Sequence, residues 1–126
     1  MKKIINTDKA PSAIGPYSQA IKANGFIFVS GQLPVDPASG RFAEGVAAQT
    51  KQSLENVKAI LTEADCTFND VVKATVFIKD MDNFSEVNNV YAAYFTKECP
   101  ARACIEVARL PKDALIEIEV IAICKQ

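Results

Sequence analysis

The sequence contains no histidine and no tryptophan. The lack of histidine excludes the Ser-His-Asp triad, Cys-His catalytic pairs and every metal site that depends on imidazole ligands. No Cys-x-x-Cys spacing occurs either, which excludes a zinc ribbon and a thioredoxin-like motif. The four cysteines are Cys66, Cys99, Cys104 and Cys124. Most of them are expected to be buried small hydrophobic residues, and Cys66 is expected to be the most exposed.

Long apolar runs and blocks of like charge are also absent. The apolar runs are short and interrupted, so none is predicted to span a bilayer, and residues 1–8 hold no stretch long enough for a signal peptide. Fourteen basic and fifteen acidic residues give a net charge of -1, which provides no electrostatic footprint for a nucleic acid. We therefore expect a cytoplasmic protein with no membrane partner and no nucleic-acid partner. The five scattered glycines form no phosphate-binding loop.

Residues 1–126 are predicted to form one globular domain, because the hydrophobic fraction of 49% and charged fraction of 23% are ordinary for a soluble protein of this length. Residues 17–22 and 26–33 are predicted strands, and the Asn24-Gly25 dipeptide between them favours a tight hairpin. Apolar residues at three- and four-residue steps predict an amphipathic helix over 46–64.

The second half of the chain continues with a strand, a helix and two strands. Residues 71–80 alternate, and one face of this predicted strand carries Val72, Ala74, Val76 and Ile78. In the helix that follows, Asn83 and Glu86 have the spacing of a capping box. Further alternating runs predict strands over about 102–108 and 115–124.

This order of elements predicts a two-layer α+β domain, a mixed β-sheet with two helices on one face. The last predicted strand is apolar on both faces near its end, although a two-layer domain leaves one sheet face in water. We therefore expect the second face to meet another subunit in a homo-oligomer.

Arg102 and Glu117 are the strongest candidates for chemistry. Arg102 begins a strand directly after Pro100-Ala101, and its five N–H donors match a carboxylate. Strand alternation places Glu117 and Glu119 on one face beside isoleucines, an environment that raises a carboxyl pKa toward the range useful for proton transfer. Taken alone, each residue has a commoner role. For Arg102 this is an ion pair with Glu106 or Glu119, and for Glu117 a solvated edge-strand charge.

Other candidates have weaker support from the residues themselves. Tyr17 leaves a rigid Gly15-Pro16 turn and could present a phenol to a site, although a tyrosine at a sheet rim is commoner. Gly31 would let backbone approach a ligand closely beside Ser30. Asn88 is either a cleft residue or a surface amide, and Cys104 should point the same way as Arg102. Without an activating base, the backbone of Cys104 is a better candidate than its sulfur.

Several separated segments resemble the RidA/YjgF family of reactive-intermediate deaminases. The resemblance covers nearly the whole chain, and its most specific parts are 100–111 and Ile116-Glu117-Ile118-Glu119. The other matching segments are Ala13-Ile14-Gly15-Pro16-Tyr17-Ser18-Gln19-Ala20, Val29-Ser30-Gly31-Gln32-Leu33-Pro34-Val35, 52–60, Val76-Phe77-Ile78-Lys79-Asp80 and Asn88.

This resemblance implies a chorismate-mutase-like fold, a homotrimer with clefts between subunits, and no metal or cofactor. It also implies hydrolysis of the enamine/imine products of pyridoxal-phosphate dehydratases to 2-oxo acids and ammonia. Arg102 would hold the substrate carboxylate, Glu117 would activate water, and Tyr17 would position substrate or water. Gly31, with Ser30 beside it, and Cys104 would offer backbone contacts, and Asn88 would line the cleft.

The loop over 96–99 is shorter than in many members of the family, which leaves the cleft shape and the substrate range open. A different class of function also stays open at this point. The same cleft could serve a non-catalytic, 2-oxo-acid-binding regulatory protein or a redox-switched, chaperone-like protein.

Overall fold

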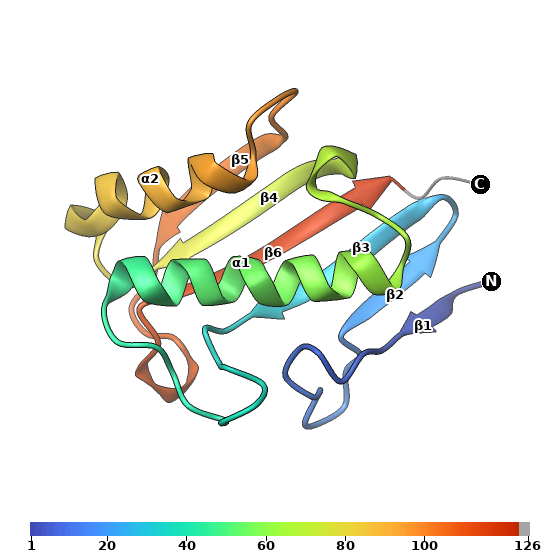
Figure 1. Ribbon diagram of the computed structural model, residues 1–126, viewed down its shortest axis with the longest axis horizontal. Coiled ribbons are helices and arrows are strands. Elements are labelled where there is room, and N and C mark those ends of the chain that lie inside the picture. Colours follow the sequence, from blue (N-terminus) through green and yellow to red (C-terminus); the bar gives the residue numbers. More distant parts are fainter. Residues whose placement is uncertain (124–126) are drawn as a thin grey trace.

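The computed structural model describes residues 1–123. Within them one mixed β-sheet carries both long helices on a single face (Figure 1). The strands are β1 (Lys3–Ile5), β2 (Ala20–Ala23), β3 (Phe26–Gln32), β4 (Val71–Ile78), β5 (Ala101–Glu106) and β6 (Ile116–Ile123), and the helices are α1 (Val46–Glu63) and α2 (Phe84–Tyr94). The predicted two-layer α+β class is confirmed. Cys124, the last residue of one predicted strand, lies outside the described residues.

The sheet has the strand order β1-β2-β3-β6-β4-β5. Every neighbouring pair is antiparallel except β4 and β5, which run parallel. Parallel neighbours need a crossover, and α2 supplies it by returning the chain over one face of the sheet. This connection brings α2 above β5, the strand that carries Arg102 (Figure 1).

The predicted hairpin is present, and its turn explains its position. Asn24 and Gly25 have φ angles of 52° and 82°, as a two-residue turn with both central residues in the left-handed region requires. The first strand begins at Ala20 rather than at Tyr17. The strand β1 was not predicted, since a strand of three residues is too short to display an alternating pattern.

The core lies between the helices and the inner face of the sheet. On α1, Leu54, Val57, Ile60 and Leu61 are each at most 1% exposed. They share one cluster with inward-facing residues of β3 and β6, among them Ile27, Ile116, Ile118 and Val120. Each such side chain stabilises the fold by about 1.5–3 kcal/mol relative to its exposed state.

Three local predictions were wrong. Val72 is 36% exposed instead of buried, because the pairing of β4 with β6 shifts register between Val71 and Lys73. Asn83 makes no capping hydrogen bond; a short 3₁₀ turn precedes α2, and Asp80 caps that turn by accepting from the Asp82 amide. Cys66 is 3% exposed and belongs to the core.

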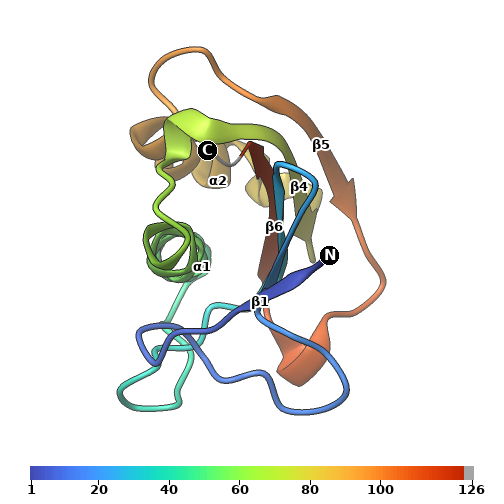
Figure 2. The same ribbon diagram turned by 90° about the vertical axis from the view of Figure 1, so that its right-hand side faces the viewer.

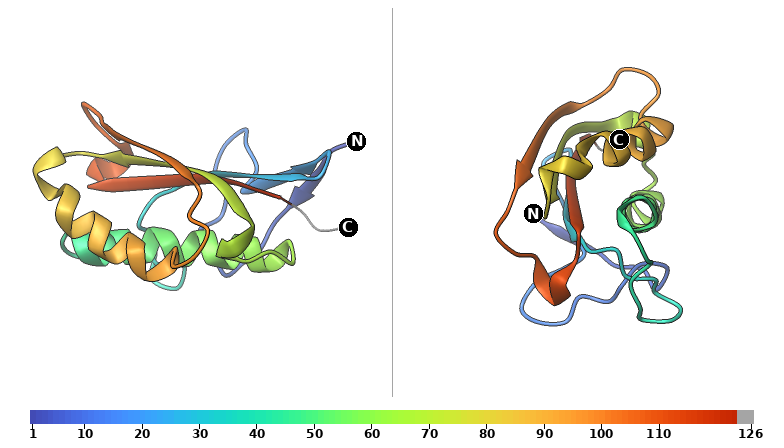
Figure 3. Two further views of the ribbon diagram at one scale, coloured as in Figure 1. Left: turned by 90° about the horizontal axis from the view of Figure 1, so that it is seen from above. Right: turned by 90° about the vertical axis from the view of Figure 1, so that its left-hand side faces the viewer.

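Neither α1 nor α2 covers the outer face of the sheet (Figures 2 and 3). It exposes large apolar side chains from three strands: Phe26 (40%), Phe28 (44%), Ile105 (45%) and Ile123 (48%). The predicted apolar character of this face is therefore confirmed, and it continues from β6 onto β3 and β5. Within the described residues, no helix is long and apolar enough to cross a membrane.

Asn56 links α1 to the loop that follows β3. Its amide donates to the Leu33 and Val35 carbonyls at 3.1 and 2.8 Å, and its side-chain oxygen accepts from Gln52 at 3.0 Å. We expect Asn56→Ala to lower the free energy of unfolding by about 2–3 kcal/mol in urea titrations, since the two carbonyls lose their partner. The control Gln52→Ala should cost about 0.5 kcal/mol. Equal losses in the two variants would contradict this account of Asn56.

Candidate functional site

Arg102 lies on β5 with its side chain on the helix side of the sheet. Its register partner on β4 is Ala74, which is fully buried against the core. Above it, α2 presents three side chains along one face. The guanidinium donates from Nη1 to Asn88 Oδ1 at 2.7 Å, and its Cζ lies 4.7 Å from the Tyr91 ring centroid and 5.5 Å from that of Phe84.

Over the described residues of one chain, Arg102 does not form the alternative ion pair with Glu106 or Glu119. Within the described residues no carboxylate forms a salt bridge with Arg102, and Glu106 instead accepts a hydrogen bond from the Met81 amide at 2.8 Å. Arg102 is exposed and held by neutral groups. Its positive charge and most of its N–H donors therefore stay available to a ligand.

Cys104 lies two residues after Arg102 on the same face of β5, as alternation predicts. It is half-buried and packs against the core. Burial raises the pKa of the Cys104 thiol, and the nearby Arg102 charge offsets part of this effect. A thiol with a raised pKa is a poor nucleophile near neutral pH, so the sulfur is not suited to covalent chemistry.

Glu117 lies on the outer face of β6, opposite Phe77 of β4. Its carboxyl group is half-buried, and burial raises its pKa, with a further contribution from the negative charge of Glu119. Gly31 of β3 lies directly against it. A Cβ atom at position 31 would sit 2.6 Å from Glu117 Oε2 and 2.8 Å from Cδ, so only glycine leaves room for the carboxylate in this position.

Tyr17 and Ser30 approach the same region from the chain around β3. Tyr17 is 54% exposed and borders a cavity of about 510 Å³ that Gly31, Gln32 and Lys112 also line. The Ser30 hydroxyl donates to the Ser18 carbonyl at 2.6 Å, which fixes the chain immediately after Tyr17. Tyr17, Ser30, Gly31 and Glu117 therefore form one group.

The predicted site residues fall into two groups on opposite faces of the sheet. Arg102, Asn88 and Cys104 lie on the helix side, at the edge strand β5. Glu117 and its neighbours lie on the outer side, and β4 separates β6 from β5. One chain alone does not bring Arg102 and Glu117 together.

Two contributors were not recognised in the sequence. Buried Gln19 accepts from the Thr7 amide at 2.7 Å and donates to the Thr7 carbonyl at 3.0 Å and the Pro11 carbonyl at 2.8 Å, which ties down the loop before Tyr17. Tyr91 contacts Arg102 and was not among the candidate site residues. The four- and three-residue steps from Phe84 to Asn88 to Tyr91 could have revealed this shared face.

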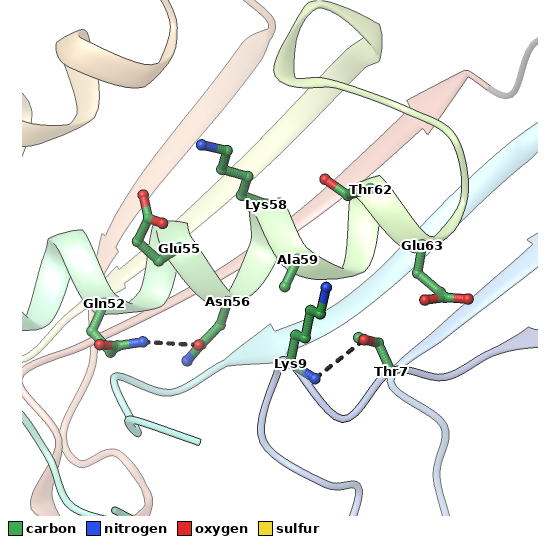
Figure 4. A pocket seen from close by; sticks show the side chains of 9 residues that line it. All are labelled: Thr7, Lys9, Gln52, Glu55, Asn56, Lys58, Ala59, Thr62 and Glu63. Carbon is green, nitrogen blue, oxygen red and sulfur yellow. Dashed lines mark hydrogen bonds between the residues drawn. The ribbon is translucent and has the colours of Figure 1, made fainter. Parts of the chain in front are cut away.

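A second cavity of about 460 Å³ lies between α1 and the segment after β1, away from every predicted site residue (Figure 4). It places the basic residues Lys9 and Lys58 beside the acidic residues Glu55 and Glu63. Its remaining lining residues are Thr7, Gln52, Asn56, Ala59 and Thr62. This mixture of charges selects no ligand. In the described part of the chain, no three His, Cys, Asp or Glu side chains gather to hold a metal ion.

Comparison with known proteins identifies the class. A family model described as Endoribonuclease L-PSP matches residues 7–124. A Pyrococcus horikoshii protein of the RutC family is 56% identical over 97% of this chain and 98% of its own length. A Salmonella typhimurium protein named 2-iminobutanoate/2-iminopropanoate deaminase is 54% identical over 98% of both chains.

Solved structures agree with this assignment. The yjgF gene product of Escherichia coli is 51% identical, superposes with a TM-score of 0.94, and is matched over 98% of this chain and 99% of its own. Escherichia coli TdcF, determined with bound serine, is 46% identical with the same TM-score and the same coverage. The chain belongs to the RidA/YjgF family.

The raised pKa of Glu117 makes stability depend on pH. The folded state holds this proton up to a higher pH than the unfolded chain, so the wild type loses stability as pH rises from the ordinary pKa of glutamate through the raised pKa. Glu117→Gln has no carboxyl group at this position and so does not lose stability in this way. We expect the free energy of unfolding of Glu117→Gln, minus that of the wild type, to increase with pH between the two pKa values and then to level off. Urea titrations at fixed protein concentration measure this difference. A flat difference between Glu117→Gln and the wild type would contradict the raised pKa of Glu117.

Proposed function

We propose that this protein is a 2-iminobutanoate/2-iminopropanoate deaminase. It hydrolyses the enamine/imine products released by pyridoxal-phosphate dehydratases to 2-oxo acids and ammonia, in the cytoplasm. The observation that carries the proposal is the state of Arg102: a charged guanidinium at a sheet edge, with neutral partners and free donors. The relative of that name at 54% identity supports the choice of reaction.

Arg102 binds the substrate carboxylate. Its planar guanidinium offers parallel N–H donors that match the two carboxylate oxygens, which orients the adjacent imine carbon as well as binding the ligand. Asn88 holds one guanidinium nitrogen and so limits the rotation of the group. The backbone of Cys104 lies beside this anchor on the same strand.

Glu117 acts as the base and then as the acid. Its carboxylate takes a proton from water while the water oxygen bonds to the imine carbon, and the C=N π electrons move to nitrogen. The protonated Glu117 then gives its proton to that nitrogen, which completes a carbinolamine. Glu117 next takes the hydroxyl proton of the carbinolamine and passes it to the amine nitrogen, so that the C–N bond breaks, the C=O bond forms, and ammonia leaves with Glu117 again ionised. A raised carboxyl pKa favours this return of the proton. Tyr17, Ser30 and the Gly31 backbone position the water and substrate.

Two copies of the chain are needed to complete this site. Because Arg102 and Glu117 of one chain face opposite sides of the sheet, we propose that each site combines Arg102 of one copy with Glu117 of a neighbour in a homotrimer. The exposed apolar residues of the outer face, Phe28 and Ile123 among them, support the burial of this face against another copy.

The competing function is binding without turnover, as a sensor of 2-oxo acids or a redox-switched chaperone. The sensor needs only the Arg102 group of site residues, and the chaperone needs only an exposed thiol such as Cys99. The half-buried Glu117 against Gly31 favours the deaminase, because carboxylate binding gives no reason to keep a second carboxylate nearby.

The direct test is imine hydrolysis in a threonine dehydratase reaction that contains semicarbazide as a trap. We expect the wild type to outcompete the trap and release 2-oxobutanoate. Arg102→Ala should lower kcat/KM by about a hundredfold or more, since a charge-assisted bidentate contact is lost. Arg41→Ala, at an exposed arginine outside both groups of site residues, should match the wild type. Full activity in Arg102→Ala would overturn the assignment of Arg102.

The shared site is tested by mixing two impaired variants. Arg102→Ala and Glu117→Gln, coexpressed in equal amounts, should recover about one quarter of wild-type activity, because one cleft in four would receive both intact residues in a randomly mixed ring of copies. Each variant alone should keep only a residual activity, about a hundredfold or more below that of the wild type. If the mixture recovers nothing while mixed oligomers form, the two residues do not act in one shared cleft.

Gly31→Ala tests the contact with Glu117. The new methyl group must displace the carboxylate, which is the far end of a flexible side chain, so the fold should be retained. We expect kcat to fall by about a hundredfold, in line with the cost of misplacing a catalytic group by an ångström. In the Glu117→Gln background the same change should have little further effect in a double-mutant cycle, and additive losses would contradict the contact.

A further inference from the structure

Arg102 rests against one face of α2. Phe84, Asn88 and Tyr91 follow each other at steps of four and three residues, so their side chains lie along a single stripe of the helix. All three contact the Arg102 guanidinium: the two aromatic rings lie 5.5 and 4.7 Å from its Cζ, and the amide accepts one hydrogen bond. The stripe therefore surrounds the guanidinium on the helix side.

These contacts differ from the usual way of fixing an arginine. A carboxylate partner would occupy the parallel N–H donors and neutralise the charge that a substrate carboxylate needs. An aromatic ring attracts the cation through its π face and consumes no N–H donor. Only Asn88 uses a donor, at Nη1. Aromatic contacts thus limit the movement of Arg102 without competing with its ligand.

Tyr91 is itself rigidly placed. It is 6% exposed, and its ring stacks on Phe95 with 4.4 Å between centroids and 26° between planes. Its hydroxyl is buried and has no hydrogen-bond partner. The hydroxyl therefore gives the fold no hydrogen bond that phenylalanine would lack, and the ring is the part of Tyr91 that contacts the Arg102 guanidinium.

We propose that Tyr91 and Phe84 are positioning residues, whose rings hold the Arg102 guanidinium by cation–π contact in the orientation that receives the substrate carboxylate. This inference rests on the proposed function, because it assigns the role of Arg102 to carboxylate binding. It predicts an effect on substrate binding, with the chemical step at Glu117 left intact.

The experiment compares KM and kcat for imine hydrolysis in matched variants. Phe84→Leu and Tyr91→Leu should each raise KM about three- to fivefold, as expected for one cation–π contact to an exposed guanidinium, with kcat nearly unchanged. Tyr91→Phe should restore the wild-type KM. Phe68→Leu is the control, because Phe68 packs on Tyr94 and Phe95 and does not contact Arg102.

A fluorinated ring separates electrostatics from packing. Pentafluorophenylalanine at position 84 keeps the shape of the ring but reverses its quadrupole, so it should raise KM as much as Phe84→Leu does. Unchanged KM in this variant and in both leucine variants, with an active wild type, would overturn the inference and leave the proposed function standing.

A third measurement keeps the two proposals distinguishable. If the wild type hydrolyses no imine, the proposed function fails, and calorimetric binding of 2-oxobutanoate then tests the positioning role directly. Weaker binding by Phe84→Leu and Tyr91→Leu than by Phe68→Leu would support the role of the rings. Equal binding by all three variants, or no binding by the wild type, would overturn it.

Discussion

The alternation of side chains across one sheet controls how this protein can function. Both helices cover the same face, so every inward residue of β4 and β6 is buried in the core and every outward residue stays at least partly exposed. The Arg102 side chain lies on the inward face, on the edge strand β5 beneath α2. The Glu117 side chain lies on the outward face, on β6 in the middle of the sheet. A reaction that needs both must therefore be carried out between chains.

The two groups of site residues differ in their electrostatic environment. Arg102 is not paired with a carboxylate, because its neighbours on α2 are an amide and two aromatic rings. Burial and the negative charge of Glu119 raise the pKa of Glu117. Gly31 supplies space beside that carboxylate where any other residue would collide with it. Together these environments suit a site that binds a small carboxylate and transfers protons between water and an adjacent C=N bond.

The sequence predicts the elements well and their relative placement poorly. Period-two patterns identify β4 and β6, and the helical period identifies α1, because each depends only on neighbours along the chain. The exposure of Val72 escapes such patterns, since a shift in register is a property of two strands together. Asn83 was misassigned because its spacing to Glu86 does not reveal the 3₁₀ turn that occupies the helix start.

The same limit applies to the site. Both Arg102 and Glu117 were identified from their strands, and alternation correctly put Cys104 with the first and Glu119 with the second. Which face of one strand corresponds to which face of another depends on strand order and crossover, and these are set by the whole fold. The position of α2 above β5 explains why Asn88 meets Arg102, a contact that is 14 residues apart in sequence.

The most direct test is a crystal structure of the protein with 2-oxobutanoate, the stable product of the proposed reaction. We predict that the ligand carboxylate binds Arg102 of one protomer, and that the ligand carbonyl carbon lies within about 4 Å of the Glu117 carboxylate of a neighbouring protomer, close to hydrogen-bonding reach through a single water. A ligand that contacts Arg102 with no neighbouring Glu117 beside it would contradict the shared site and, with it, the proposed mechanism.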